Sequence, residues 1–139
     1  MGLYLCIFDG DEEVDGVEVG PYAEFSTFRD CVVRRLEGGS AGSKFPTLIL
    51  HSDCDGEWSP SEAVELEKEL IIIGNEFRRL PPVHLDSEWK RLVVKNKNIG
   101  SQTKNLYDCF FEVDGEPLLE RLIGLAKLSH TKNLPIIFQ

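Results

Sequence analysis

The sequence is poor in basic side chains. Its 139 residues include 15 Lys and Arg against 24 Asp and Glu, which gives a formal net charge of -9. A protein with this balance repels the phosphates of nucleic acids and the surface of an anionic membrane. The charge therefore argues against direct binding to DNA, RNA or membranes, and it leaves basic proteins and cations as partners.

Long apolar runs and paired cysteines are also missing. Apolar runs such as those at 3–8, 70–73 and 134–138 have only four to six residues, whereas a membrane-spanning helix needs about 18. The first residues lack the basic start and long apolar stretch of a signal peptide. The four cysteines lie far apart, with no Cys-x-x-Cys pair, so neither a zinc site nor a disulfide framework is indicated. We expect a cytoplasmic protein whose thiols are mostly buried, and no cofactor.

What the sequence contains is the pattern of one α/β domain over residues 1–139. Short apolar runs at 3–8, 47–50 and 134–138 predict buried strands. Residues 9–20 are acidic and contain several glycines, which favours a loop. The predicted fold class is α/β, with α+β as the alternative, built on a small single-layer mixed sheet of about four strands with three to four helices.

Apolar residues at intervals of three and four predict the helices. The first begins at Pro21 and ends near Gly38. Ser59 and Glu62 form a capping-box pattern that starts the second, which ends near residue 80. A third begins at Asp86 or Ser87 and points Trp89, Leu92 and Val93 inward, and a loop follows at 96–103. The last helix covers 117–129, and the segment 106–113 fits either a strand or a short helix followed by one.

Acidic residues concentrate in two segments. Residues 9–24 contain seven acids and no base, and residues 53–69 contain seven acids and one base. If the strands at 3–8 and 47–50 run parallel, the loops after them emerge at the same edge of the sheet. We therefore predict one continuous anionic rim there.

The segment from His51 to Trp58 allows two further interpretations. His51 and Cys54, oriented by Asp53 or Asp55, would form a base and nucleophile pair, or the acidic loops 9–15 and 51–57 would bind a metal for hydrolysis. The sequence has no nucleophile elbow, glycine-rich phosphate loop or oxyanion-hole signature, so a non-enzyme is favoured. Trp58, beside carboxylates, is typical of an interface anchor, and its alternative is packing onto the core before the helix cap.

Three strings of the sequence resemble the bacterial immunity protein 70 family. They are residues 1–13, residues 51–60 and residues 113–122, and the similarity extends to the closing 135–139. The resemblance implies a small cytoplasmic protein that neutralises the toxin domain of a polymorphic toxin system and so protects the producing cell. It supplies no catalytic residues.

This resemblance and the charge together predict an acidic toxin-binding surface. The expected partner is a basic toxin domain, such as a nuclease, because an acidic surface mimics the phosphates that a nuclease cleft binds. The predicted binding residues are Asp11, Glu12, Glu13, Asp53, Asp55, Glu57 and Trp58. A metal-dependent hydrolase and an acidic regulatory module remain the alternatives, and the sequence leaves a homodimer open.

Overall fold

Four strands and five α-helices form the fold in the residues that the computed structural model describes, which are 2–83, 87–97 and 103–139. In chain order they are β1 (Leu3–Asp9), β2 (Glu12–Gly20), α1 (Tyr22–Leu36), α2 (Pro46–Ile49), β3 (Glu57–Trp58), α3 (Pro60–Arg78), α4 (Glu88–Lys97), the 3-10 helix η1 (Leu106–Cys109), α5 (Leu118–Lys132) and β4 (Ile136–Phe138). The predicted α/β class with a sheet of about four strands is confirmed. The predicted mixed sheet is wrong, because every pairing among the described strands is antiparallel.

The sheet has the strand order β2-β1-β4-β3, and each of its three pairings is antiparallel. β1 and β2 form a hairpin whose turn contains Gly10, a residue with the positive φ of 65° that glycine tolerates best. The predicted loop at 9–20 is therefore wrong. Val17 and Val19 are buried while Glu18 between them is exposed, the alternation of a strand with one buried face.

The predicted strand at 47–50 is also wrong, because these residues form the short helix α2. Pro46 occupies its first turn, where a missing N–H costs nothing. The carboxylate of Glu69, from the middle of α3, accepts hydrogen bonds from the backbone N–H groups of Thr47 (3.2 Å) and Leu48 (3.0 Å). A distant acid thus caps α2 and completes its hydrogen bonds.

We expect the substitution Glu69→Ala to lower the free energy of unfolding by about 2 kcal/mol, because two N–H groups lose a charged acceptor. Glu69→Gln keeps one acceptor oxygen without the charge, so its loss should be smaller. Urea denaturation monitored by circular dichroism measures both. If the alanine variant were as stable as the native protein, Glu69 would not hold α2 in place.

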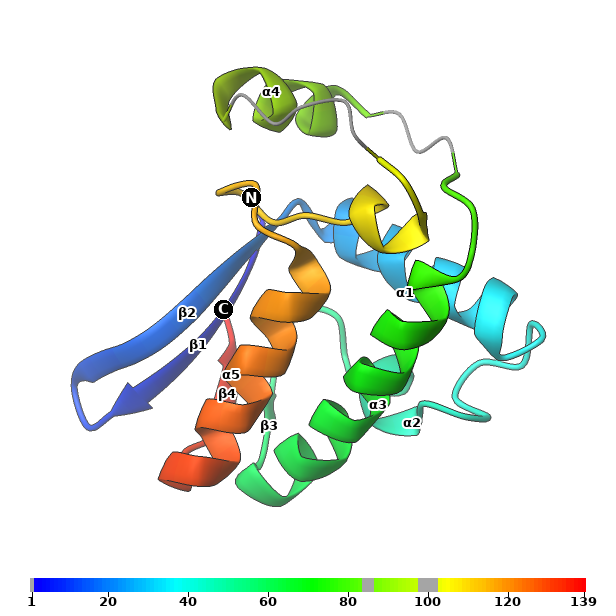
Figure 1. Cartoon of the computed structure of the whole chain (residues 1–139). Coiled ribbons are helices and arrows are strands. Elements are labelled where there is room, and N and C mark those ends of the chain that lie inside the picture. Colours follow the sequence, from blue (N-terminus) through cyan, green and yellow to red (C-terminus); the bar gives the residue numbers. More distant parts are fainter. Residues whose placement is uncertain (1, 84–86, 98–102) are drawn as a thin grey trace.

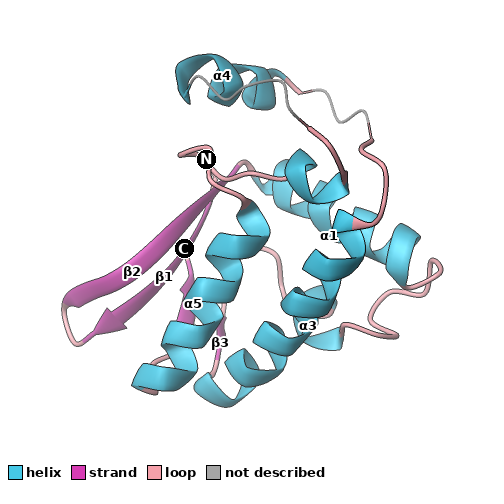
Figure 2. Cartoon of the chain, viewed as in Figure 1, coloured by secondary structure: helices cyan, strands magenta, loops and turns pink. Residues whose placement is uncertain are grey.

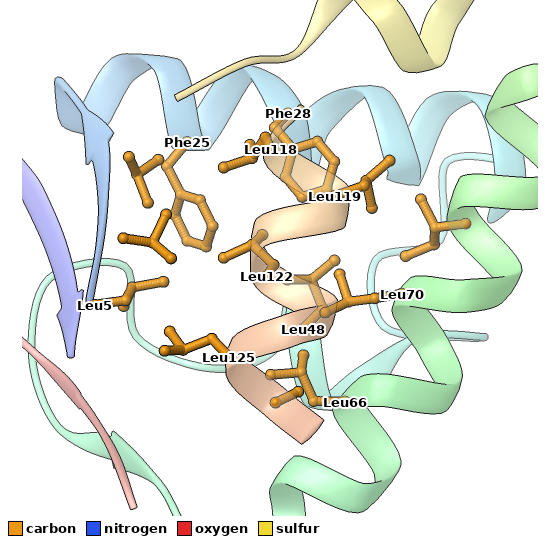
Figure 3. Close-up of a cluster of buried hydrophobic side chains, with 14 of the residues drawn as sticks. Leu5, Phe25, Phe28, Leu48, Leu66, Leu70, Leu118, Leu119, Leu122 and Leu125 are labelled. Carbon is orange, nitrogen blue, oxygen red and sulfur yellow. The ribbon is translucent and has the colours of Figure 1, made fainter. Parts of the chain in front are cut away.

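The helices lie on one side of the sheet, and the core fills the space between them (Figures 1 and 2). Figure 3 shows side chains from β1, α1, α2, α3 and α5 pointing toward one another in this core. The predicted capping box of α3 is confirmed, since Ser59 Oγ accepts from the Glu62 N–H at 3.1 Å and Glu62 Oε1 accepts from the Ser59 N–H at 3.0 Å. The helices predicted from Pro21 and Pro117 and the closing strand are confirmed as α1, α5 and β4.

The helix predicted near residue 87 is confirmed as α4, and of its predicted inward residues Val93 is buried and Trp89 stacks on Phe111, whereas the prediction for Leu92 is wrong. Leu92 points to solvent with 51% of its surface exposed, while Val93 and Lys90 are buried. Asp86, one of its two predicted starts, and residues 98–102 of the predicted loop lie outside the described residues. In the ambiguous segment 106–113, the structure has η1 followed by an isolated bridge from Phe111 to Pro117.

The outer edge of β2 is partly occupied by residues from the C-terminal third of the chain. The backbone N–H of Val113 donates to the carbonyl of Glu18 at 3.0 Å, and Arg121 Nη2 donates to the carbonyl of Gly16 at 2.8 Å. Unpaired strand edges invite pairing with other chains. These two bonds therefore restrict strand addition along the C-terminal half of β2.

Candidate functional site

The acidic segments 9–15 and 51–57 lie at opposite ends of the sheet. β1 and β3 both pair antiparallel with β4, so they point in the same direction. The hairpin turn follows the end of β1, and the segment 51–56 precedes the start of β3. The predicted single rim at one edge is therefore wrong, because it assumed a parallel strand at 47–50. The hairpin turn also lies on the β2 side of the sheet, so the two segments occupy diagonally opposite corners.

The hairpin corner presents exposed carboxylates in two directions. Asp11 and Glu12 are exposed at the turn. Glu13 lies on the face of the sheet that points away from the helices, and its Oε1 accepts a hydrogen bond of 2.5 Å from the hydroxyl of Tyr4. This bond to Glu13, together with burial, raises the pKa of Tyr4 to about 12. Asp15 points to the other side and lies 3.7 Å from Arg121.

The metal interpretation finds no site geometry in the part of the chain that the structure describes. Glu13 and Asp15 point to opposite faces of the hairpin, as their different partners show. Among residues 2–83, 87–97 and 103–139, no three His, Cys, Asp or Glu side chains are grouped so that they could hold a metal ion.

The second corner is organised around the ring of His51. This ring stacks on Phe138 with a centroid distance of 4.3 Å. Its Nδ1 lies 2.8 Å from the carbonyl oxygen of Ser52, and its Nε2 lies 2.9 Å from that of Glu57. Cys54 is exposed, and its Sγ lies 3.7 Å from Ser52 Oγ. Because both ring nitrogens meet backbone carbonyls, the predicted pair of base and nucleophile is not formed. Asp53, Asp55 and Glu57 are exposed around this ring.

Trp58 is part of the core. Its side chain is 1% exposed, and its indole N–H donates to the carbonyl oxygen of Thr47 at 3.0 Å. The ring packs edge-on against Phe138. The interpretation as an exposed interface anchor is therefore wrong, and the alternative of packing onto the core before the cap of α3 is confirmed. Alternation along β3 causes this, because Glu57 and Trp58 point to opposite faces.

A surface that the sequence reasoning did not single out lies between the two corners. Leu3, Leu5 and Ile7 of β1 point into the core, so Tyr4, Cys6 and Phe8 point the other way. Cys6 pairs with Gly16 on one side and with Ile137 on the other, and Ile137 pairs with Glu57. Paired residues of antiparallel strands share a face. The residues of this outer sheet face are Tyr4, Cys6, Phe8, Glu13, Gly16, Glu18, Glu57 and Ile137.

Among the described residues, no helix covers the outer sheet face (Figure 1). Tyr4, Phe8 and Ile137 are half-buried there, while Glu13, Glu18 and Glu57 are exposed. The ring of Tyr4 lies directly over Gly16, since a Cβ atom at position 16 would come within 2.1 Å of the Tyr4 hydroxyl. No signal in the sequence pointed to this face, because residues 3–8 form a continuous apolar run that does not reveal which side chains point outward.

Other charged side chains hold the helical layer together. Lys90 Nζ donates to the carbonyl of Cys109 at 3.0 Å and lies 3.4 Å from Glu24, which joins α4 to η1 and α1. Burial lowers the pKa of Lys90, and the neighbouring Glu24 opposes that shift. Glu112, 1% exposed, lies 3.9 Å from Arg121, and burial raises its pKa. Lys90 is thus a structural group.

The family of this chain follows from its comparison with known proteins. No described helix combines the length and apolar character needed to cross a bilayer. The chain matches no curated protein and no solved structure. The model of the family described as immunity protein 70 matches residues 3–138, almost the whole chain. This match confirms the resemblance of the three strings, and the chain belongs to the immunity protein 70 family.

Proposed function

We propose that this protein binds a cognate toxin domain and neutralises it, and that the producing cell is protected in this way. The observation that carries the proposal is the match to an immunity protein family over residues 3–138. The proposal takes the cytoplasm as the place of action and protein binding, without catalysis, as the mechanism.

The toxin domain that we propose is basic. The chain carries 24 acidic and 15 basic residues, and opposite charges on two partners speed their encounter and exclude wrong partners. A nuclease domain fits this description, because its cleft must attract phosphates. An acidic protein surface competes for the same cleft.

The proposed contacts are the exposed acids of the two corners. Asp11, Glu12 and Glu13 belong to the hairpin corner, and Asp53, Asp55 and Glu57 belong to the His51 corner. Trp58, predicted from the sequence to be a binding residue, is not a proposed contact because it is buried. Binding at both corners would require a toxin surface that spans the sheet diagonally.

The function is tested by searching the genes next to the one that encodes this protein for a toxin domain, and by expressing that domain in a bacterial host with and without this protein. We expect growth to stop with the toxin domain alone and to be restored by co-expression. A host that dies in both cases would contradict the proposed function. A metal-dependent hydrolase would instead lose activity and stability on chelation.

The acidic contacts are tested by reversing charges at both corners. The triple substitution Glu12→Lys, Asp55→Lys and Glu57→Lys should weaken binding roughly 100-fold at low salt, and less at high salt, because exposed charges are screened. The matched control reverses three exposed acids on the helices, Glu65, Glu88 and Glu120. Equal affinities of the two triple variants, measured by calorimetry, would show that the corners are not the contact surface.

A further inference from the structure

We infer that the outer sheet face is the surface on which the toxin domain docks, with Tyr4, Phe8 and Ile137 as its apolar centre and the carboxylates at its two edges as contacts for Arg and Lys side chains. This inference rests on the proposed function and specifies where and how the partner binds. It adds Tyr4, Phe8, Glu18 and Ile137 to the residues expected from the sequence.

Within residues 2–83, 87–97 and 103–139, no other element packs on this face. Tyr4, Phe8 and Ile137 are half-buried and take no part in the core cluster. A sheet normally buries one face and solvates the other with polar residues. Here the centre of the solvated face carries two aromatic rings and an isoleucine, which is the composition of an interface centre.

Acidic side chains surround this apolar centre. Every charged residue in the four strands is acidic, and the first basic residue of the chain is Arg29 in α1. Glu13 and Glu18 lie on β2 at one edge of the face, and Glu57 lies on β3 at the other. Because four strands span about 14 Å, a partner that covers the apolar centre meets carboxylates on both sides.

This charge pattern selects the occupant. A second copy of the chain would bring the same carboxylates against one another, which disfavours a dimer through this face. A partner with Arg and Lys around an apolar patch would pair with both edges at once. Arg is also enriched at interface centres, where its planar group stacks on aromatic rings. The occupant is therefore a basic protein surface.

The outer sheet face is small. Seven residues of β1 and a width of four strands give a footprint of at most roughly 300 Å². A stable interface buries about 800 Å² on each partner. The face alone is too small, and the hairpin corner and the His51 corner adjoin it at opposite ends. Together the three parts form one continuous surface, which accounts for the separation of the two acidic segments.

The test uses two variants on the face but outside both corners. Glu18→Lys places a base beside the apolar centre, and Phe8→Ala removes one of its rings. Each should weaken binding to the cognate toxin domain by roughly tenfold or more. The matched controls are Glu120→Lys, which makes the same charge change on α5, and Leu92→Ala, which removes an exposed apolar side chain on α4. Neither control should change the affinity more than about twofold.

A second readout maps the contact directly. A photoreactive benzoylphenylalanine in place of Phe8 should cross-link to the toxin domain, while the same group in place of Leu92 should not. If the native protein does not bind the toxin domain, the proposed function is wrong and this inference falls with it. If the native protein binds, and both face variants keep native affinity without a cross-link at position 8, the function stands and the face is not the docking surface. A native dimer that Glu18→Lys dissociates would show that a second copy covers the face.

Discussion

Replacing Trp58 with alanine is expected to lower the free energy of unfolding by about 4 kcal/mol, the usual loss when a large aromatic side chain is removed from a core. The ring is 1% exposed and packs against His51 and Phe138. Its N–H also joins β3 to the start of α2 through the carbonyl of Thr47. Loss of the ring therefore removes apolar burial and leaves that carbonyl without its partner. Equilibrium denaturation in urea measures the effect.

The variant Trp58→Phe separates the two contributions. Phenylalanine keeps most of the apolar burial and loses the hydrogen bond, so we expect a loss of about 1 to 2 kcal/mol. An interface anchor would behave differently, because its substitution would weaken toxin binding and leave stability nearly unchanged. A stability loss below about 1 kcal/mol in Trp58→Ala would contradict the buried position.

The second large effect is expected at Glu37, which follows α1 and is 5% exposed. Its carboxylate accepts hydrogen bonds from the backbone N–H groups of Gly42 (3.0 Å), Lys44 (2.9 Å) and Phe45 (2.8 Å). One side chain thus organises the loop that delivers the chain to α2. We expect Glu37→Ala to cost about 3 kcal/mol, because the buried N–H of Phe45 loses its acceptor and the loop loses its anchor. Thermal and urea denaturation measure this.

Two other variants calibrate this loss. Glu37→Gln retains one acceptor oxygen and should lose about half as much stability. Glu65→Ala removes an exposed acid from α3, whose ion pair with Lys68 is open to solvent, and should change stability by less than about 0.5 kcal/mol. Similar stabilities for Glu37→Ala and Glu65→Ala would mean that the carboxylate does not organise the loop.

The helices could be predicted because their signals are local. The capping box at Ser59 and the apolar spacing of α1, α3 and α5 lie within the segments themselves. α2 is different, because the residue that caps it, Glu69, lies on another helix. Thr47 and Ile49 favour a strand by propensity, and tertiary contacts override such preferences.

The candidate site was predictable in composition and not in arrangement. The acids of both corners are visible in the sequence, and they are exposed as expected. Their placement depends on strand direction. The prediction assumed that the loop 51–57 follows a strand at 47–50, whereas in the structure this loop precedes β3 and so lies at the other end of the sheet. β2 was missed because acids and glycines disfavour strands by propensity, although Val17 and Val19 alternate with Glu18. The outer sheet face depends on that strand and so could not be anticipated.

The contact between Tyr4 and Gly16 has a consequence for related sequences. The Tyr4 ring occupies the space that any side chain at position 16 would need, so the two positions are not independent. Glycine at 16 is required only while an aromatic residue stands at 4. An alignment of relatives should therefore show paired exchanges: chains with a small residue at position 4 are free to carry alanine or a larger residue at 16, and chains that keep the aromatic ring should keep glycine.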